Sequence, residues 1–170
     1  MMKFKIKSTV EFEKLKDFLE DPIAITRNRI SIQQSLDSEE NSKELLTTQL
    51  EKYNKGIDIL FSELVQKRHV PLKSTPMFSW QINNEQITSS CWQVERIVPK
   101  VLQASLFLES GHDLLPDYKL ASAKYAKAMQ MHEQIIKNLL TWKWKNSDLH
   151  HPIFQCAWHN SCIAHLQCLQ

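Results

Sequence analysis

The feature that most constrains the fold is an apolar stripe in the segment 37–69. Large apolar residues recur there at intervals of four, three, four, three and four residues. They are Leu46, Leu50, Tyr53, Ile57, Leu60 and Leu64. This spacing places all of them on one side of an α-helix, so the segment is predicted to form one amphipathic helix of about thirty residues. Asp37 or Ser38 is expected to cap its start, and the basic residues at 67–69 suit the negative end of its dipole.

Two shorter helices are predicted before this stripe. The first covers 11–20, where the apolar residues have helical spacing. The second begins at Asp21 and Pro22, because an aspartate cap followed by proline is typical of a helix N-terminus. Its expected buried residues are Ile23, Ile30 and Leu36.

Three helices are predicted in the second half of the chain. The first covers about 89–109, with a kink or break at Pro99 and an end at Gly111. The next begins at Asp117, and Pro152 opens the last helix, which runs to the C-terminus. One side of the helix after Asp117 is expected to carry Leu120, Ala121, Tyr125, Ala128, Met131 and Ile135.

Strands are expected only in two short places. Apolar and basic residues alternate over 4–10, which suits a short edge strand, and 77–82 is expected to be extended. The chain has only two glycines, Gly56 and Gly111, which argues against a glycine-rich phosphate loop, a dinucleotide-binding fingerprint and a turn-rich β-sandwich. The predicted fold class is mostly α, a helical array with one or two short N-terminal strands, forming a single domain over 1–170.

Composition narrows the classes of partner. The net charge is +2 at pH 7, so a nucleic-acid partner is not expected. Lysines interrupt the N-terminal segment and no apolar run approaches the length of a membrane span, so a cytoplasmic location with reduced cysteines is expected. Trp142 and Trp144 alternate with Lys143 and Lys145. This pattern suits a peripheral contact with an acidic membrane surface, although a solvated turn is the simpler interpretation.

The C-terminal segment carries cysteine and histidine at every third position. These residues are Cys156, His159, Cys162, His165 and Cys168. Three positions along an α-helix turn about 300°, so five such residues spread over about 240° and cannot converge on one ion. Packing is therefore the favoured interpretation, with neither a metal nor another cofactor expected. Phe154, Trp158, Cys162 and Leu169 are expected to form the buried side, with Ala157, Ser161 and Ala164 allowing close helix approach.

Taken in order, the helices resemble the N-terminal half of a Bro domain, the Alix-type module of ESCRT adaptor proteins. The aromatic segment of that family is matched by Phe78, Ser79 and Trp80, and its core helix by Glu95 and Arg96. Ile97, Val98, Ala104 and Ser105 continue that helix, and Tyr125 and Ala128 occupy the aromatic and alanine positions of the next one. The resemblance implies tetratricopeptide-like helix packing, with Trp80, Glu95 and Tyr125 in architectural roles.

The resemblance also implies a non-enzymatic interaction scaffold in the cytoplasm, associated with endosomes. Its partner would be an amphipathic helix of an ESCRT-III-type subunit, bound at a surface centred on Trp158, Leu166 and Leu169. A structural subunit of a larger assembly, such as a viral particle or multiprotein complex, is the alternative. Residues 152–170 contain no Asp, Glu, Lys or Arg, so their uncovered faces suit neighbouring subunits. A small Cys/His metal-binding protein is the second alternative.

Overall fold

The computed structural model describes residues 2–10, 12, 22–38, 42–67, 76–141 and 150–170. It divides into two compact units, Met1–Arg96 and Ile97–Gln170. The single domain expected over 1–170 stays a prediction. The elements in chain order are β1 (Phe4–Ile6), α1 (Pro22–Asp37), α2 (Lys43–Lys67), β2 (Phe78–Ile82), β3 (Glu85–Ser89), α3 (Trp92–Asp113), α4 (Tyr118–Thr141), the 3₁₀ turn η3 (Pro152–Phe154) and α5 (Cys156–Cys168).

Unit 1 contains a three-stranded antiparallel sheet in the order β1-β2-β3. The edge strand predicted in 4–10 is confirmed as β1, and the extended segment at 77–82 is confirmed as β2. Strand β3 was not predicted, and it follows β2 through a two-residue turn. Asn83 in that turn has a φ of 54°, and asparagine is among the residues that best tolerate this conformation.

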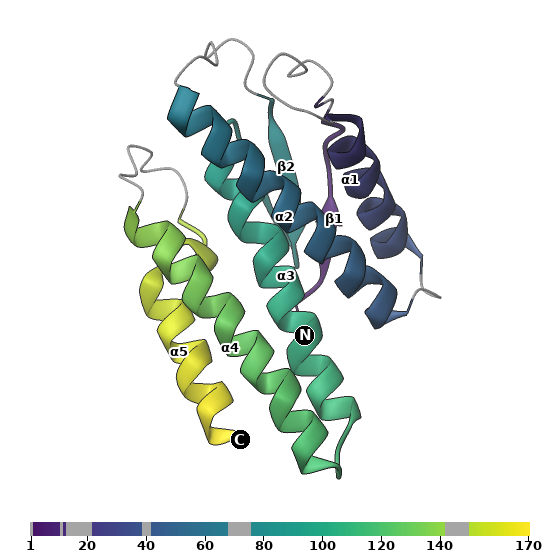
Figure 1. The fold of residues 1–170 in the computed structure, drawn as a ribbon, viewed down its shortest axis with the longest axis vertical. Helices are drawn as coiled ribbons and strands as arrows, with labels where there is room; N and C mark the ends of the chain where they lie inside the picture. The colour runs from purple at the N-terminus through teal and green to yellow at the C-terminus, as the bar shows by residue number, and fades with distance from the viewer. Residues whose placement is uncertain (1, 11, 13–21, 39–41, 68–75, 142–149) are drawn as a thin grey trace. The chain divides into compact units, whose positions relative to one another are not determined.

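The apolar stripe lies on α2, which packs beside α1 in unit 1 (Figure 1). Its residues from Leu46 to Leu60 are buried as predicted, and the side chain of Leu64 lies outside the described residues. The predicted cap is wrong. Ser42 caps α2, since its Oγ accepts a hydrogen bond from the Leu45 N–H at 3.1 Å, whereas Asp37 still belongs to α1.

The predicted buried side of α1 is also wrong. Ile23 and Ile30 are 46% and 42% exposed, and the buried apolar residues of the helix are Ile25 and Ile32. The inward side carries Arg29, which is only 3% exposed. Charged residues are mostly exposed, so the arginine made this side of α1 look solvent-facing in the sequence. The helix predicted at 11–20 lies outside the described residues, apart from Phe12.

Helix α3 contains Pro99, where a kink or break was predicted, and Gly111, where its end was predicted. It continues without a break through Pro99, although proline has no N–H to bond to the Glu95 carbonyl one turn earlier. It also continues past Gly111 to Asp113, so the predicted end at Gly111 is wrong. Gly111 has no positive φ, and its lack of a side chain instead leaves room for the ring of Tyr125.

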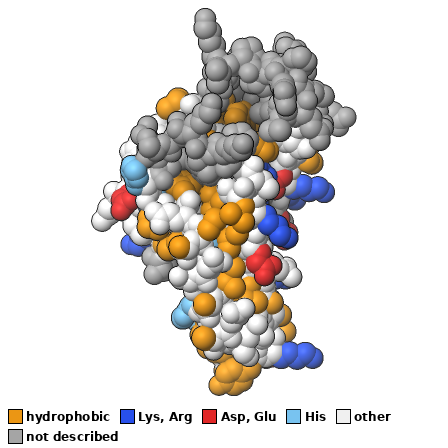
Figure 2. Space-filling model, turned by 90° about the vertical axis from the view of Figure 1, so that its left-hand side faces the viewer, with side chains coloured by type: hydrophobic (Ala, Val, Ile, Leu, Met, Phe, Trp, Pro, Cys, Tyr) orange, Lys and Arg blue, Asp and Glu red, His pale blue; other side chains and the backbone are white. Residues whose placement is uncertain are grey.

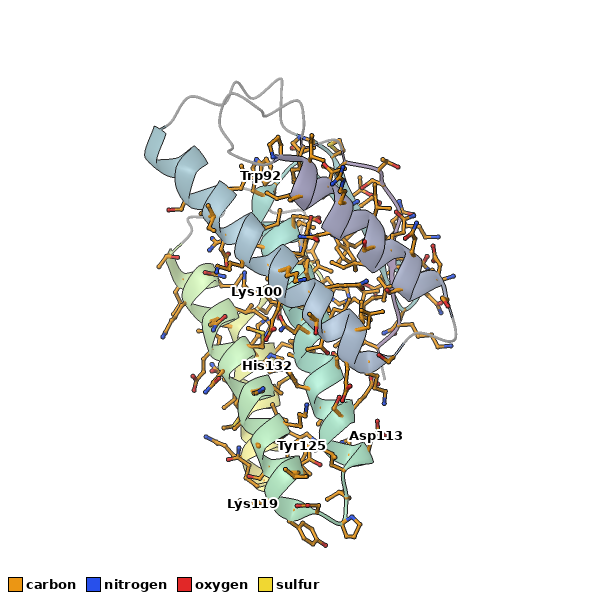
Figure 3. The ribbon with its side chains drawn as sticks, turned by 45° about the vertical axis from the view of Figure 1, so that its right-hand side comes forward. Trp92, Lys100, Asp113, Lys119, Tyr125 and His132 are labelled. Atoms are coloured by element: carbon orange, nitrogen blue, oxygen red, sulfur yellow. The ribbon has the colours of Figure 1, made fainter. Side chains whose placement is uncertain are left out.

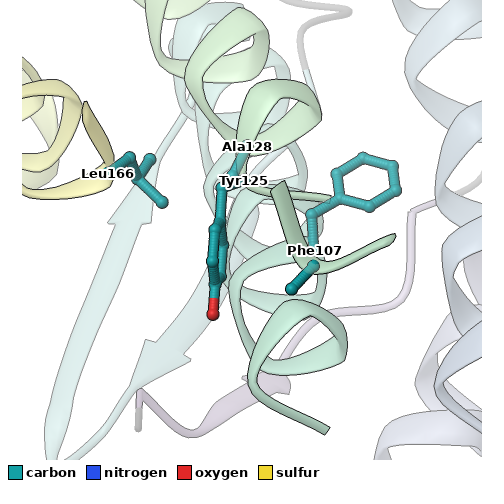
Figure 4. Close-up of a cluster of buried hydrophobic side chains, with 5 residues drawn as sticks. Phe107, Tyr125, Ala128 and Leu166 are labelled. Carbon is teal, nitrogen blue, oxygen red and sulfur yellow. The ribbon is translucent and has the colours of Figure 1, made fainter. Parts of the chain in front are cut away.

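Unit 2 is built from α3, α4, η3 and α5. Asp117 caps α4 as predicted, its Oδ1 accepting from the Leu120 N–H at 3.1 Å, but Leu120 is 51% exposed and not on the buried side. Helix α5 packs along α4, and a cluster of buried apolar residues joins α3, α4 and α5 (Figure 4). Its members are Phe107, Ala121, Tyr125, Ala128 and Leu166.

The mostly helical fold class with short strands is confirmed. The predicted last helix is divided, because η3 ends at Phe154 and α5 begins at Cys156. Among the described residues, no helix is long and apolar enough to cross a membrane.

We expect the substitution Gly111→Ala to destabilise unit 2. An added Cβ would lie 2.3 Å from Cε1 and 2.7 Å from Cδ1 of Tyr125, and a buried ring in a packed cluster can retreat only by disturbing its neighbours. The expected loss is about 1–3 kcal/mol in the free energy of unfolding, measured by urea denaturation.

Gly56→Ala in α2 is the matched control. There the added Cβ would lie 3.2 Å from Cγ1 of Ile25, a side-chain atom that can move slightly, and alanine is the better helix former by about 1 kcal/mol. This variant should be close to neutral or stabilised. Equal destabilisation of both variants would contradict the proposed role of Gly111.

Candidate functional site

A buried polar cluster around Glu95 lies at the centre of unit 1. The Glu95 carboxylate is fully buried at the start of α3. Its Oε1 accepts hydrogen bonds from Arg29 Nε at 2.8 Å and from the hydroxyl of Tyr53, and its Oε2 accepts from Trp80 Nε1 at 2.8 Å. One carboxylate thus connects α1, α2, β2 and α3, and charge-assisted hydrogen bonds of this kind are stronger than neutral ones.

The guanidinium of Arg29 extends the cluster to the segment after β1. Its NH1 donates to the carbonyl of Ser8, and NH2 lies 3.4 Å from Ser8 Oγ. That same Oγ accepts from the backbone N–H of Ser79 at 2.9 Å. Arg29 also lies over the Trp80 ring, with Cζ 5.7 Å from the ring centroid. The arginine therefore fixes the chain beside the sheet as well as pairing with Glu95.

The electrostatics of the cluster agree with a structural role. Burial alone would lower the pKa of Arg29, but the nearby Glu95 carboxylate helps to raise it above its ordinary value. Burial and the charge of Glu95 raise the pKa of Tyr53 well above its usual range, which keeps its hydroxyl protonated as a donor. Both carboxylate oxygens accept hydrogen bonds from partners in the chain itself, so the carboxylate holds elements of unit 1 in position.

The residues predicted to be architectural are only partly brought together. Trp80 and Glu95 meet directly in the cluster, whereas Tyr125 lies on α4 in unit 2 (Figure 3). The Tyr125 hydroxyl is 3.0 Å from His112 Nδ1. Arg29 was not predicted to belong to a site, and the apolar stripe predicts the burial of Tyr53 but not its hydrogen bond to Glu95. No local pattern could identify Arg29, because its partner is 66 residues away.

A second polar arrangement joins α4 to α5 in unit 2. His132 of α4 and His159 of α5 are 6% and 0% exposed, and their Nδ1 atoms are 2.9 Å apart. His159 Nε2 lies 2.7 Å from the carbonyl oxygen of Ile153. A carbonyl can only accept, so Nε2 of His159 carries the hydrogen and its Nδ1 is the acceptor. His132 must then donate through Nδ1–H.

This order of donors applies when both imidazoles are neutral, and burial favours that neutral state. Burial lowers the pKa of His132 to about 4, with a further contribution from the charge of His159. Burial also lowers the pKa of His159, although its hydrogen bond to Ile153 acts in the opposite direction. The edge-on Trp158 ring, 5.8 Å from His132 and 4.9 Å from His159 between centroids, helps to enclose the pair.

The cysteine and histidine residues of α5 do not gather into one ligand set. His159 is buried against His132, Cys156 and Cys162 are half-buried, and His165 and Cys168 are exposed. Within the described part of the chain, no three residues among histidine, cysteine, aspartate and glutamate are placed to hold a metal ion. Burial raises the pKa of the Cys162 thiol, which disfavours the thiolate that binds metals.

The packing predicted for this helix needs correction. Ala157, Ser161 and Ala164 are exposed, and do not lie in a close helix contact. Phe154 is buried as predicted, but Trp158, Cys162 and Leu169 are only half-buried. His159 and Leu166 are instead the buried side chains of α5.

The three residues predicted to bind a partner differ in accessibility. Leu166 is 2% exposed and points into the cluster with Tyr125 and Ala128 (Figure 4). Leu169 packs at the edge of the same cluster, and Trp158 lies beside the histidine pair. Their role in binding stays a prediction, and in this conformation it would depend on Trp158 and Leu169.

Comparisons with protein-family models, curated proteins and solved structures found no match to this chain.

We expect Glu95→Gln to destabilise unit 1 by about 3–5 kcal/mol, because it leaves the buried Arg29 guanidinium without its counter-charge. Urea denaturation measures the loss. Asp58→Asn is the matched control, since Asp58 pairs with Arg96 at a similar distance, 3.0 Å, but is 40% exposed. Its loss should be at most about 1 kcal/mol.

A double-mutant cycle tests whether the cluster acts as a unit. The combined variant Arg29→Met and Glu95→Gln removes both charges, so it should be more stable than the sum of the two single losses predicts. Strictly additive losses would show that Arg29 and Glu95 do not stabilise each other.

Proposed function

We propose that this chain is a non-enzymatic protein-interaction scaffold that receives a partner on the outer surface of α5. The observation that carries the proposal is the chemistry of that surface. Ala157, Ser161, Ala164 and Cys168 are all exposed and recur at intervals of four, three and four residues along one side of α5. Small side chains at this spacing allow another helix to approach closely.

The absence of charge strengthens the case for a covering partner. No Asp, Glu, Lys or Arg occurs in 152–170, whereas the exposed residues of α4 include Lys119, Lys127 and Lys137. Figure 2 shows the side of the molecule on which α5 lies, with hydrophobic and uncharged groups over most of the described surface and few charged side chains. A helix surface without charge is typical of one that is covered in an assembly.

The resemblance to the Bro domain suggests which partner would fit. Members of that family bind a C-terminal amphipathic helix of ESCRT-III subunits, and a helix laid along an apolar surface is a general mode of recognition. We therefore favour an amphipathic partner helix of this type, in a cytoplasmic and endosome-associated setting. The second candidate is a structural subunit of a larger assembly, because an uncharged surface would equally suit a neighbouring subunit.

The direct test measures binding of labelled ESCRT-III tail peptides by fluorescence anisotropy. We expect saturable binding at micromolar concentration and at least about a tenfold loss of affinity in Ala164→Glu, because the substitution places a carboxylate in the contact. Ala164 is exposed in the unbound chain, so the fold should tolerate the change. Ala123→Glu, on the exposed side of α4, is the matched control and should bind as the unmodified chain does.

Two outcomes separate the candidates. No binding of any tail peptide at high micromolar concentration would remove the ESCRT-III partner. If light scattering then shows self-association that Ala164→Glu abolishes, the assembly-subunit function is supported. A monomer at high concentration that binds no peptide would contradict both.

A further inference from the structure

We propose that α5 is an acid-released helix: uptake of a proton by the His132–His159 pair detaches α5 from α4. The pair joins the two helices through the 2.9 Å contact between their Nδ1 atoms. This inference concerns the control of α5 and does not depend on which partner binds its outer surface.

The attachment of α5 depends on few side chains. Of its residues from Cys156 to Cys168, only His159 and Leu166 are buried, although Trp158, Cys162 and Ile163 are partly covered. Gln155 at its N-terminus makes no side-chain capping hydrogen bond. One of the two buried contacts is therefore a titratable group, and a change in its charge acts directly on the docking of the helix.

The hydrogen-bond order explains why a proton opposes docking. In the neutral pair, His132 Nδ1–H donates to His159 Nδ1, and His159 Nε2–H donates to the Ile153 carbonyl. A proton added to His159 must occupy Nδ1, so two N–H groups would then face each other across 2.9 Å. A proton added to His132 occupies Nε2 and places a charge at a buried position. Detachment exposes both rings to water and removes either conflict.

Among the described residues, neither ring has a hydrogen bond or ion pair with a carboxylate. Helix α5 has no acidic residue, and η3 contributes the Ile153 carbonyl, with the half-buried His151 at its N-terminus. On α4 the carboxylate of Glu133 is exposed. On the part of α3 in this unit, Lys100 is buried, Glu109 is half-buried and Asp113 is exposed. His165 on α5 is exposed. No described carboxylate therefore stabilises an added proton on the pair through direct contact.

The direction of the pH effect follows from linkage. The docked form lowers the pKa of His132 from 6.5 to about 4, and detachment restores the ordinary value. Docking is thus unaffected above about pH 6.5, weakens as the pH falls below that value, and levels off below about pH 4. At pH 4.5 the shift of His132 alone weakens docking by roughly 50- to 100-fold.

Amide hydrogen exchange of the full chain, read by mass spectrometry and corrected for intrinsic rates, tests the proposal. We expect the protection of peptides from α5 to fall by roughly 50- to 100-fold between pH 7 and 4.5, while peptides from α2 keep theirs. Unchanged protection of α5, or an equal loss in α2, would overturn the proposal, since the release would be absent or would be general unfolding. Histidine NMR provides an independent measurement: titration of both rings at their ordinary pKa would also overturn it.

Two variants test whether the pair is responsible. The double variant His132→Asn and His159→Gln keeps amide donors and acceptors but removes both titrations, so the protection of α5 should no longer depend on pH. His165→Gln removes the exposed histidine of the same helix and should keep the full response. A double variant that responds like the unmodified chain, or a response lost in His165→Gln, would assign the effect to other groups and overturn the proposal.

Discussion

The contact on which unit 1 depends is the buried pairing of Arg29 with Glu95. The carboxylate brings together one residue each from α1, α2 and β2, and the guanidinium adds the chain beside Ser8. A buried ion pair is rarely the strongest source of net stability, because both charges lose their hydration. Here the ion pair instead favours one alignment of the surrounding elements over others. A different alignment of α2 or β2 would remove Tyr53 or Trp80 and leave a buried charge with fewer partners.

Unit 2 has a different organisation. Its helices pack closely because small residues lie between them. Gly111 leaves room for the Tyr125 ring, and Ala121 and Ala128 lie within the apolar cluster. One of its buried polar contacts, the histidine pair, contains neutral groups at neutral pH. The two units therefore respond differently to acid. A buried ion pair needs its charges, whereas the attachment of α5 needs the charge to be absent.

The proposed scaffold function and the proposed release of α5 concern opposite sides of one helix. The outer side presents small, uncharged residues, and the inner side carries His159 and Leu166. If α5 detaches, the apolar cluster that includes Phe107 and Tyr125 loses Leu166 as its cover. Acid would then expose these apolar groups, which α5 covers at neutral pH, and a partner would meet a different surface.

The sequence by itself determined the helical class, the buried stripe of α2 from Leu46 to Leu60, and the starts of α1 and α4, because helical spacing and capping are local properties. It could not determine the buried side of α1, since the inward position of Arg29 depends on a carboxylate 66 residues away. Nor could it show that His159 pairs with His132, 27 residues earlier, and not with its neighbours in the cysteine and histidine series. Only the tertiary structure decided these pairings, because burial makes a polar group seek whichever partner the fold brings within hydrogen-bond distance.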